Sequence, residues 1–258
     1  MIKVENLSYS VKGKNLLHNL DLEIQKGKIH FIIGPNGAGK STFVHLAAGK
    51  LEAGSKNIWY EGRRLSEFSA NALAQKRAVL SQFTEIAFPI QVLDVVMLGR
   101  YPYFTNNPSK EDRDIVEKCI ALLDLESFRE RNILSLSGGE KQRVHIARVL
   151  AQIWKAEKEE QAVLFLDEPL NSLDIYYQIF VLRLLKRLQE EQNLTIVGVV
   201  HDLNLAAQYA DDLSIFYEGQ VVATGLVDEI FTQEHIQLYF RLEGKLLEFE
   251  GKKQLLFS

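Results

Sequence analysis

One short motif constrains this chain more than any other feature. Residues 34–41 read Gly-Pro-Asn-Gly-Ala-Gly-Lys-Ser and match the pattern G-x-x-x-x-G-K-[ST] in full. A short apolar run at 28–33 is typical of a buried strand, and 40–50 has the pattern of a helix. Glycines let backbone N–H groups close around phosphate oxygens, and a helix start adds a positive dipole. The context predicts a nucleotide-phosphate site, not a glycine-rich turn that only caps a helix.

The positions of this loop carry separate expectations. We expect Lys40 to reach the β- and γ-phosphates and the Ser41 hydroxyl to ligate Mg²⁺. The other predicted nucleotide-binding positions belong to the loop or follow it: Gly34, Pro35, Asn36, Gly37, Ala38, Gly39 and Thr42.

A pair of carboxylates, Asp167 and Glu168, follows an apolar strand expected at 162–166 and precedes Pro169. An aspartate at the carboxyl edge of a strand holds Mg²⁺ in phosphoryl-transfer sites. The adjacent Glu168 can orient and deprotonate the attacking water. Alone, such a pair would more often be a solvated turn. Behind a complete phosphate loop, it predicts the metal ligand and the catalytic base.

Composition limits the class of protein. The chain has 258 residues, of which 47% are hydrophobic, enough for a sizeable core. Cys119 is the single cysteine, which excludes an intramolecular disulfide and favours a reducing cytosol. A net charge of −4 argues against nucleic acid as a partner. Without an apolar run of roughly 18–20 residues or a signal-peptide pattern, we expect an intracellular, folded protein.

The patterning predicts one α/β domain with an insertion. Alternation over 2–24 indicates antiparallel strands, and alternating strands and helices over 162–210 indicate a mainly parallel sheet. We expect a single domain over 1–240, an inserted helical lobe at about 83–134 and a short β-rich tail at 241–258. Further expectations concern single segments: helices at 69–77, at 110–125 with a capping box of Ser109 and Asp112, and near 226–239, and an irregular aromatic-rich stretch over 83–108.

The segment Leu136-Ser-Gly-Gly-Glu140 separates the possible functions. Ser137 and Glu140 have the spacing of a capping box at a helix start. Gly138 and Gly139 just inside that helix cost helix stability. They make sense if a phosphate must approach this helix N-terminus closely.

Together, these three motifs resemble those of the ATP-binding cassette (ABC) ATPases over about residues 2–240. The resemblance implies a P-loop NTPase of ABC-ATPase type, with a mixed sheet core, an N-terminal antiparallel β-subdomain and an inserted α-helical lobe. It implies ATP and Mg²⁺ as cofactors. Gln82 resembles the glutamine that touches Mg²⁺ or the attacking water. Asp174 resembles the aspartate of the D-loop, which crosses to a partner subunit, and His201 resembles the switch histidine at the γ-phosphate.

Adenine stacking departs from the family pattern. The position that usually holds an aromatic falls on Val11, and Tyr9, two residues away on the same strand, is the predicted substitute. A second departure is Leu170-Asn171, where small or hydroxylated residues are common in the family.

The signature segment also predicts a homodimer. The phosphate loop already supplies one helix N-terminus to the nucleotide. A second one, at Ser137, Gly138, Gly139 and Glu140, can also be used if the nucleotide is held by another copy. ATP would then lie between two subunits, in two composite sites.

A narrower resemblance comes from residues 77–82, 87–90 and 95–102, which are similar to importers of iron chelates, haem and cobalamin. Residues 147–154, with the charged stretch after them, resemble the ATP-binding subunits of hemin importers. This implies transmembrane permease subunits and a substrate-binding protein as partners, and a peripheral position on the cytoplasmic face of the inner membrane. The alternatives are a ferric-siderophore or cobalamin importer and a soluble, non-transport ABC protein; the chain lacks the heptads, cysteines and second cassette of the soluble types.

Overall fold

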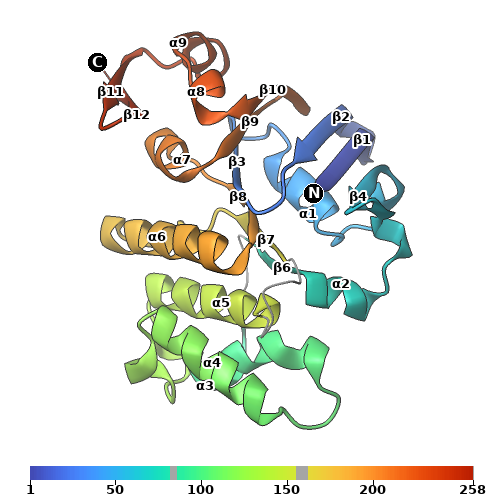
Figure 1. Cartoon of the computed structure of the whole chain (residues 1–258), viewed down its shortest axis with the longest axis vertical. Helices are drawn as coiled ribbons and strands as arrows, with labels where there is room; N and C mark the ends of the chain where they lie inside the picture. The colour runs from blue at the N-terminus through green and yellow to red at the C-terminus, as the bar shows by residue number, and fades with distance from the viewer. Residues whose placement is uncertain (82–85, 155–161, 258) are drawn as a thin grey trace. The chain divides into compact units, whose positions relative to one another are not determined.

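The computed structural model describes residues 1–81, 86–154 and 162–257. It divides into two compact units (Figure 1). The first unit contains Met1–Phe68 and Thr195–Ser258, and the second contains Ser69–Leu194. Gln82 and the charged stretch at 155–161 lie outside the described residues.

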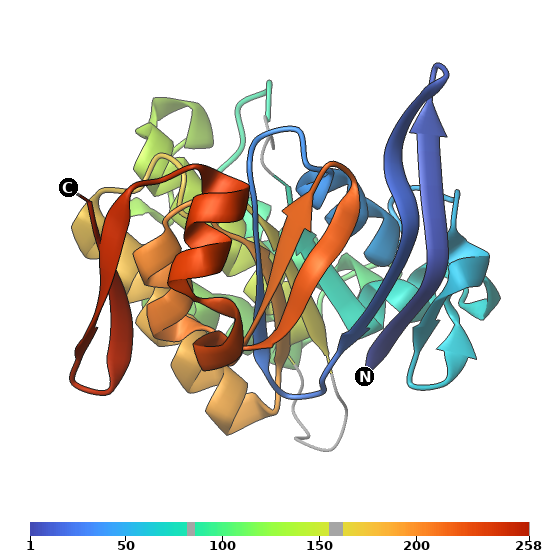
Figure 2. The same cartoon turned by 90° about the horizontal axis from the view of Figure 1, so that it is seen from above.

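The first unit begins with the predicted antiparallel sheet. Its strands follow the order β2-β1-β4-β5. Ile2 and Val4 of β1 are buried in alternation, and a register shift between Val4 and Leu7 places Leu7 among the buried residues as well. Figure 2 shows β1 and β2 as a long two-stranded ribbon. The bounds are β1 Ile2–Val11, β2 Lys14–Ile24, β4 Ile58–Tyr60 and β5 Arg63–Arg64.

The same unit contains the strand that leads into the phosphate loop. β3 (Ile29–Ile33) pairs in parallel with β8 (Thr195–Val199) on one side and with β9 (Asp212–Tyr217) on the other. β10 (Gln220–Leu226) is antiparallel to β9. Every residue of β3 and β8 is buried, which explains why neither strand alternates in the sequence. Two helices follow strands of this group: α1 Lys40–Ala47 and α7 Leu203–Tyr209.

The prediction of a single helix near 226–239 was wrong. The segment forms α8 (Val227–Ile230), α9 (Gln233–His235) and a π-helical turn at Ile236–Phe240. Thr232 causes the break, because its extended backbone ends one helix and its hydroxyl accepts the His235 N–H at 3.2 Å to cap the next. Beyond it, β11 (Gly244–Phe249) and β12 (Lys252–Phe257) form an antiparallel hairpin.

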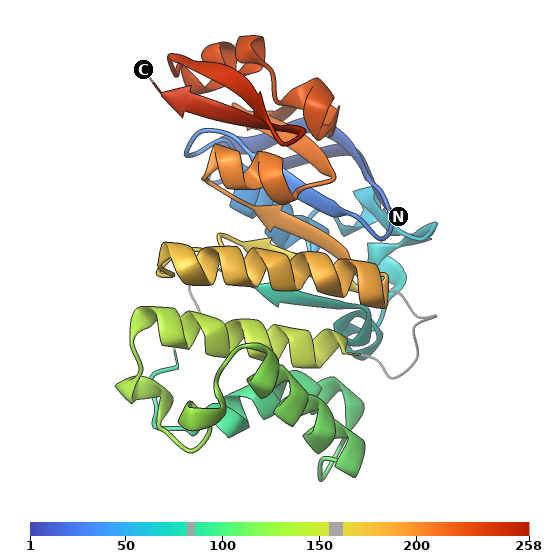
Figure 3. The ribbon, with the colours of Figure 1, turned by 60° about the vertical axis from the view of Figure 1, so that its left-hand side comes forward.

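The second unit is mainly helical. β6 (Arg77–Leu80) and β7 (Val163–Asp167) form a parallel pair. α5 and α6 lie side by side, as the views in Figures 1 and 3 agree. The helices are α2 Ala70–Lys76, α3 Val92–Met97, α4 Lys110–Leu122, α5 Gly138–Ile153 and α6 Ile175–Gln192. Short 3₁₀ turns lie at Ser55–Asn57 and Leu65–Glu67 in the first unit and at Leu98–Tyr103, Glu126–Phe128 and Ile133–Ser135 in the second.

The irregular stretch expected at 83–108 is in part helical. α3 and the 3₁₀ helix at 98–103 occupy it, because Val92, Val95 and Val96 bury one face against the rest of the unit. The run is too short and too β-branched to show a helical period in the sequence. The capping box at Ser109 and Asp112 is confirmed, with both reciprocal hydrogen bonds present.

Candidate nucleotide site

The phosphate loop lies between β3 and α1 and needs its glycines for two reasons. Gly34, Gly37 and Gly39 have positive φ angles of 148°, 79° and 96°. A Cβ on Gly34 would lie 2.1 Å from the Phe216 carbonyl oxygen, and one on Gly39 would lie 2.8 Å from that of Leu16. A Cβ on Gly37 would meet nothing within 4 Å, so this glycine borders open space. Side chains at Gly34 and Gly39 would clash with neighbouring backbone, so this conformation of the loop requires glycine at both positions.

Lys40 is the first residue of α1, and its side chain folds back under this loop. The residue is only 5% exposed, and its Nζ donates hydrogen bonds to the carbonyl oxygens of Gly34 and Pro35, each at 2.8 Å. The ammonium is therefore held within the loop where a phosphate would bind. Ser41 and Thr42 follow it in the first turn of α1 and are half-buried.

The two carboxylates lie at the end of β7. Asp167 is the last residue of the strand and is 1% exposed. Glu168 leaves the strand with a φ of 54°, in the left-handed region that glutamate rarely adopts. Its Oε2 accepts a hydrogen bond from Nδ2 of Asn171 at 2.5 Å.

Sequence reasoning treated Asn171 only as a departure from the family and missed this contact. The signal was available, since an amide three residues after a carboxylate can bond to it within one turn.

The signature segment begins α5 as expected. The Ser137 hydroxyl accepts the Glu140 N–H at 3.3 Å, and the Glu140 carboxylate accepts the Ser137 N–H at 2.7 Å. Hydrogen bonds from the backbone and hydroxyl of Ser137 lower the pKa of Glu140 below its usual range. This helix start faces a pocket of about 630 Å³, lined by Asp124, Ser127, Phe128, Ser137, Gly138, Gly139, Glu140, Arg143, Ser172, Leu173, Asp174 and Tyr177.

The structure brings the signature and D-loop segments together within this one chain. A Cβ on Gly139 would lie 2.9 Å from the Ser172 carbonyl oxygen, whereas one on Gly138 would meet Ser172 only at 3.5 Å. Gly139 thus has an intramolecular reason to be glycine that the sequence did not reveal. Asp174 caps its own helix α6, accepting the Tyr177 N–H at 2.9 Å.

The remaining predicted residues lie in the first unit or outside the description. His201 is exposed two residues after the end of β8, and Asp202 beside it caps α7. Tyr9 is half-buried opposite Leu17, and Val11 is 40% exposed. Lys40 and His201 belong to the first unit, and Asp167, Glu168 and the signature belong to the second. Their roles stay predictions.

The donor chemistry of the described residues suits magnesium. Oxygen ligands such as the Ser41 hydroxyl and the Asp167 carboxylate are those that Mg²⁺ prefers, and it takes most of its other ligands from water and phosphate. Within residues 1–81, 86–154 and 162–257, there is no cluster of three or more His, Cys, Asp or Glu side chains that could hold a metal ion without other ligands.

Comparisons with known proteins define the class. A family model described as ABC transporter matches residues 17–171, more than half of the chain. The chain is 39% identical over 248 residues to the hemin import ATP-binding protein HmuV of Escherichia coli O157:H7, covering 96% of this chain and 95% of that protein.

Solved structures agree with this match. A metal-chelate type ABC transporter in an inward-facing conformation superposes with a TM-score of 0.81 at 27% identity, covering 100% of this chain and 96% of that one. A dimeric bacterial ABC transporter cassette superposes with a TM-score of 0.76 at 27% identity, over 88% of this chain and 99% of that one.

The chain therefore belongs to the ABC transporter family. Its fold is that of the ABC ATPase cassette, a P-loop NTPase with a mixed sheet and an N-terminal antiparallel sheet. It is an ATP-binding subunit and an ATPase whose reaction is coupled to transport. Among the helices in the described part of the chain, none is long and apolar enough to cross a membrane.

Proposed function

We propose that this chain is the ATP-hydrolysing subunit of a membrane importer for hemin. The observation that carries the proposal is the 39% identity, over nearly the whole of both chains, to a protein named for hemin import. The superposition on a metal-chelate type transporter supports the same class of substrate. Ferric-siderophore or cobalamin import is the alternative, because substrate contacts normally lie on other subunits.

In this proposal, ATP binds to the loop at 34–39 and to Lys40, Ser41 and Thr42. The buried ammonium of Lys40 supports a phosphate role, since it can exchange its two carbonyl partners for phosphate oxygens. Ser41, Asp167 and Gln82 would hold Mg²⁺, which when bound neutralises charge on the β- and γ-phosphates. Tyr9, or Val11 in its place, would stack on adenine.

Hydrolysis would use Glu168 as the general base. Its carboxylate accepts a hydrogen bond from Asn171, which orients it, and it would accept the proton of the attacking water. His201 would contact the γ-phosphate, and Gln82 would sense the position of the helical lobe.

The nucleotide would be shared between two copies of the chain. The signature residues line an open pocket at a helix N-terminus, which suits the phosphates of a nucleotide carried by a partner. One related cassette is described as dimeric in two structures, and in one of these it has ADP and Pi bound. We infer a homodimer with two composite sites, in which Asp174 reaches toward the partner. Residues 1–240 would act as one cassette, with 241–258 as its tail.

The membrane subunits would dock on residues 83–104; residues 83–85 lie outside the described part of the chain, and residues 86–104 are named here the docking segment. Phe88 and Tyr101 in this segment are 59% and 60% exposed, and exposed aromatics are enriched in protein interfaces. A permease helix on this surface would hold the chain on the cytoplasmic face of the inner membrane. A substrate-binding protein would deliver hemin from the other side.

The nucleotide assignment is tested with two variants that fail in different ways. Lys40→Ala removes the charge at the phosphates, so both ATP binding and hydrolysis should be lost. Glu168→Gln keeps the shape but removes the base, so ATP should bind while turnover collapses by roughly 10²-fold or more. Binding by equilibrium dialysis and steady-state phosphate release distinguish the two. Near wild-type turnover in Glu168→Gln would assign the base elsewhere.

The docking assignment is tested with a charge on the exposed aromatic surface. Phe88→Glu should leave ATP binding intact but prevent recovery of the chain with solubilised membranes. The matched control is Phe249→Glu, because Phe249 is 61% exposed on β11 and outside the docking segment. Equal membrane recovery of both variants would count against this surface.

The substrate is tested in cells. Cells without this protein should lose growth on haem as sole iron source and retain growth on ferrous salts. Normal growth on haem would favour the siderophore or cobalamin alternative.

A further inference from the structure

The docking segment is attached to the far end of the signature helix. α5 begins at Gly138, directly after Ser137, and runs for 16 residues to Ile153, about 24 Å. Its C-terminal end packs on the 3₁₀ helix at Leu98–Tyr103. The backbone of Gly99 lies against the backbone of α5, so closely that a Cβ on Gly99 would be 2.2 Å from the Arg148 carbonyl oxygen.

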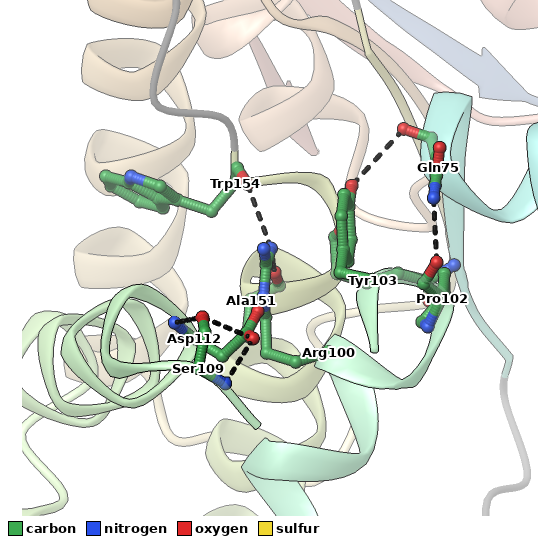
Figure 4. A network of polar contacts seen from close by, with 9 residues as sticks. Gln75, Arg100, Pro102, Tyr103, Ser109, Asp112, Ala151 and Trp154 are labelled. Atoms are coloured by element: carbon green, nitrogen blue, oxygen red, sulfur yellow. Dashed lines mark hydrogen bonds and ion pairs between the residues drawn. The ribbon is translucent and has the colours of Figure 1, made fainter. Parts of the chain in front are cut away.

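Arg100 ties this junction together (Figure 4). One of its terminal nitrogens donates to the carbonyl oxygens of Ala151 and Trp154, at 2.7 and 3.0 Å. Its Nε donates to Asp112 Oδ1 at 2.9 Å, and both side chains of this pair are 5% exposed. The guanidinium therefore caps the end of α5 and neutralises a carboxylate at the start of α4.

Further contacts join the 3₁₀ helix to α5 and to α2. The Tyr103 hydroxyl donates to the Gln152 carbonyl oxygen at 2.8 Å, and its ring lies 3.8 Å from the Arg100 guanidinium. Gln75 Nε2 donates to the Pro102 carbonyl oxygen at 2.7 Å. Tyr101, a residue that is 60% exposed, adjoins Arg100 in the sequence. A partner that moves Tyr101 therefore pulls on a segment bonded to the end of α5.

We propose that Arg100 is a positioning residue that makes the docking segment and α5 move as one body, so that docking sets the position of Ser137. The proposal rests on the proposed function, because it assumes a membrane subunit at the docking segment and a nucleotide at the signature. α5 transmits the displacement because its hydrogen bonds make it stiff along its length.

The competing interpretation is that the Arg100–Asp112 pair only stabilises the lobe. The two interpretations are separated by replacing both partners with apolar residues, Arg100→Met with Asp112→Leu. Replacing a buried ion pair in this way leaves no unpaired charge and is often neutral for stability. It still removes the donors to Ala151 and Trp154. Arg100→Lys is a second variant, since lysine keeps the charge beside Asp112 but not the planar fork of donors.

The experiment uses the complex of this chain with its co-purifying membrane subunits, reconstituted in nanodiscs. The readouts are the Tm of the chain, its recovery with the membrane subunits, its basal hydrolysis when isolated, and the stimulation of hydrolysis in the complex. The matched control is Arg129→Gln with Glu117→Gln, which removes an exposed ion pair in the same unit (2.6 Å).

Both Arg100 variants should keep basal hydrolysis and membrane recovery near wild type, while stimulation falls about fivefold or more. The control pair should keep full stimulation. Wild-type stimulation in both Arg100 variants would overturn the proposal. So would a loss of stimulation that tracks loss of Tm or of recovery, because that pattern belongs to a structural role. If the wild-type chain itself neither co-purifies with membrane subunits nor is stimulated by them, the proposed function fails, and this inference fails with it.

Discussion

The two ends of α5 are built from similar parts and differ in what they leave open. Each uses a buried arginine that donates to the last carbonyl groups of a helix. Arg143 donates to those of Leu123 and Asp124 after α4, both at 2.8 Å, and Arg100 donates to those of Ala151 and Trp154. Each guanidinium also faces a tyrosine ring, at 4.1 Å from Tyr177 for Arg143 and 3.8 Å from Tyr103 for Arg100.

Their counter-charges differ. Asp112 lies 2.9 Å from Arg100 and is 5% exposed, whereas Asp124 lies 3.9 Å from Arg143 and is 70% exposed. Among the described residues, Nε of Arg143 is buried without a hydrogen-bond partner, while Nε of Arg100 binds Asp112. At the signature end, the helix start faces a pocket and the Arg143 guanidinium is incompletely paired, as suits a binding surface. At the far end, the Arg100 guanidinium is buried with its counter-charge Asp112, as suits an anchor.

The largest expected effect is a loss of stability at the anchored end. Arg100→Ala leaves Asp112 buried without its counter-charge, which should lower the free energy of unfolding by about 3–5 kcal/mol. Arg143→Ala should cost less, because Asp124 remains in water. Urea denaturation of the two variants measures the difference. Equal losses would mean that the counter-charges do not distinguish the two ends.

Replacement by alanine should change the stability of the chain in opposite directions at Gly138 and Gly139. Gly139→Ala forces a Cβ to within 2.9 Å of the Ser172 carbonyl oxygen, so overpacking of about 1–3 kcal/mol should outweigh the gain in helix propensity. In Gly138→Ala, the nearest atom is at 3.5 Å, and the variant should gain up to about 1 kcal/mol.

Measuring ATP hydrolysis in the same variants tests whether a nucleotide approaches these glycines. If a nucleotide approaches both glycines, Gly138→Ala should be more stable than wild type and yet less active. A Gly138→Ala chain that gains stability without losing turnover would separate Gly138 from the nucleotide.

The smallest effect is expected from the cap of α5. Ser137→Ala removes the hydroxyl that caps the helix and should cost about 1 kcal/mol. The hydrogen bonds from Ser137 lower the pKa of Glu140, so this part of the stability is present above the unfolded value of 4.5 and is lost as the pH falls through the folded value. Ser137→Ala keeps the larger hydrogen bond, from the Ser137 backbone N–H, and removes only the hydroxyl's share of the pKa shift. The difference in Tm between Ser137→Ala and wild type should therefore narrow slightly on acidification; a constant difference would assign the whole effect to the bond between the hydroxyl and the Glu140 N–H.

Local features of this fold could be predicted from the sequence, and long-range ones could not. The capping boxes at Ser109 and Ser137 involve residues three apart, so their spacing was sufficient and both are confirmed. The buried strand before the phosphate loop is also a local feature, since a short apolar run was sufficient to predict it.

The Arg100 network includes residues far apart in the sequence, such as Arg100 and Trp154, which are 54 positions apart, and no periodic pattern reports such contacts. α3 was missed because it exists through burial of its valines by other parts of the lobe. Gly139 was assigned to a ligand alone, because only the structure shows Ser172 beside it. The roles of the site residues themselves stay predictions of the family resemblance.

The most direct test of this account mixes two inactive chains. Ser137→Arg places bulk and charge at the signature, and Lys40→Ala disables the phosphate loop, so neither chain alone should hydrolyse ATP. In a mixed dimer, one composite site carries both changes and the other carries neither. The account predicts that hydrolysis reappears on mixing and rises with the fraction of mixed dimers. If the mixture stays inactive in every proportion, or if Ser137→Arg alone turns over ATP, the phosphate loop of one copy and the signature of the other do not share a nucleotide.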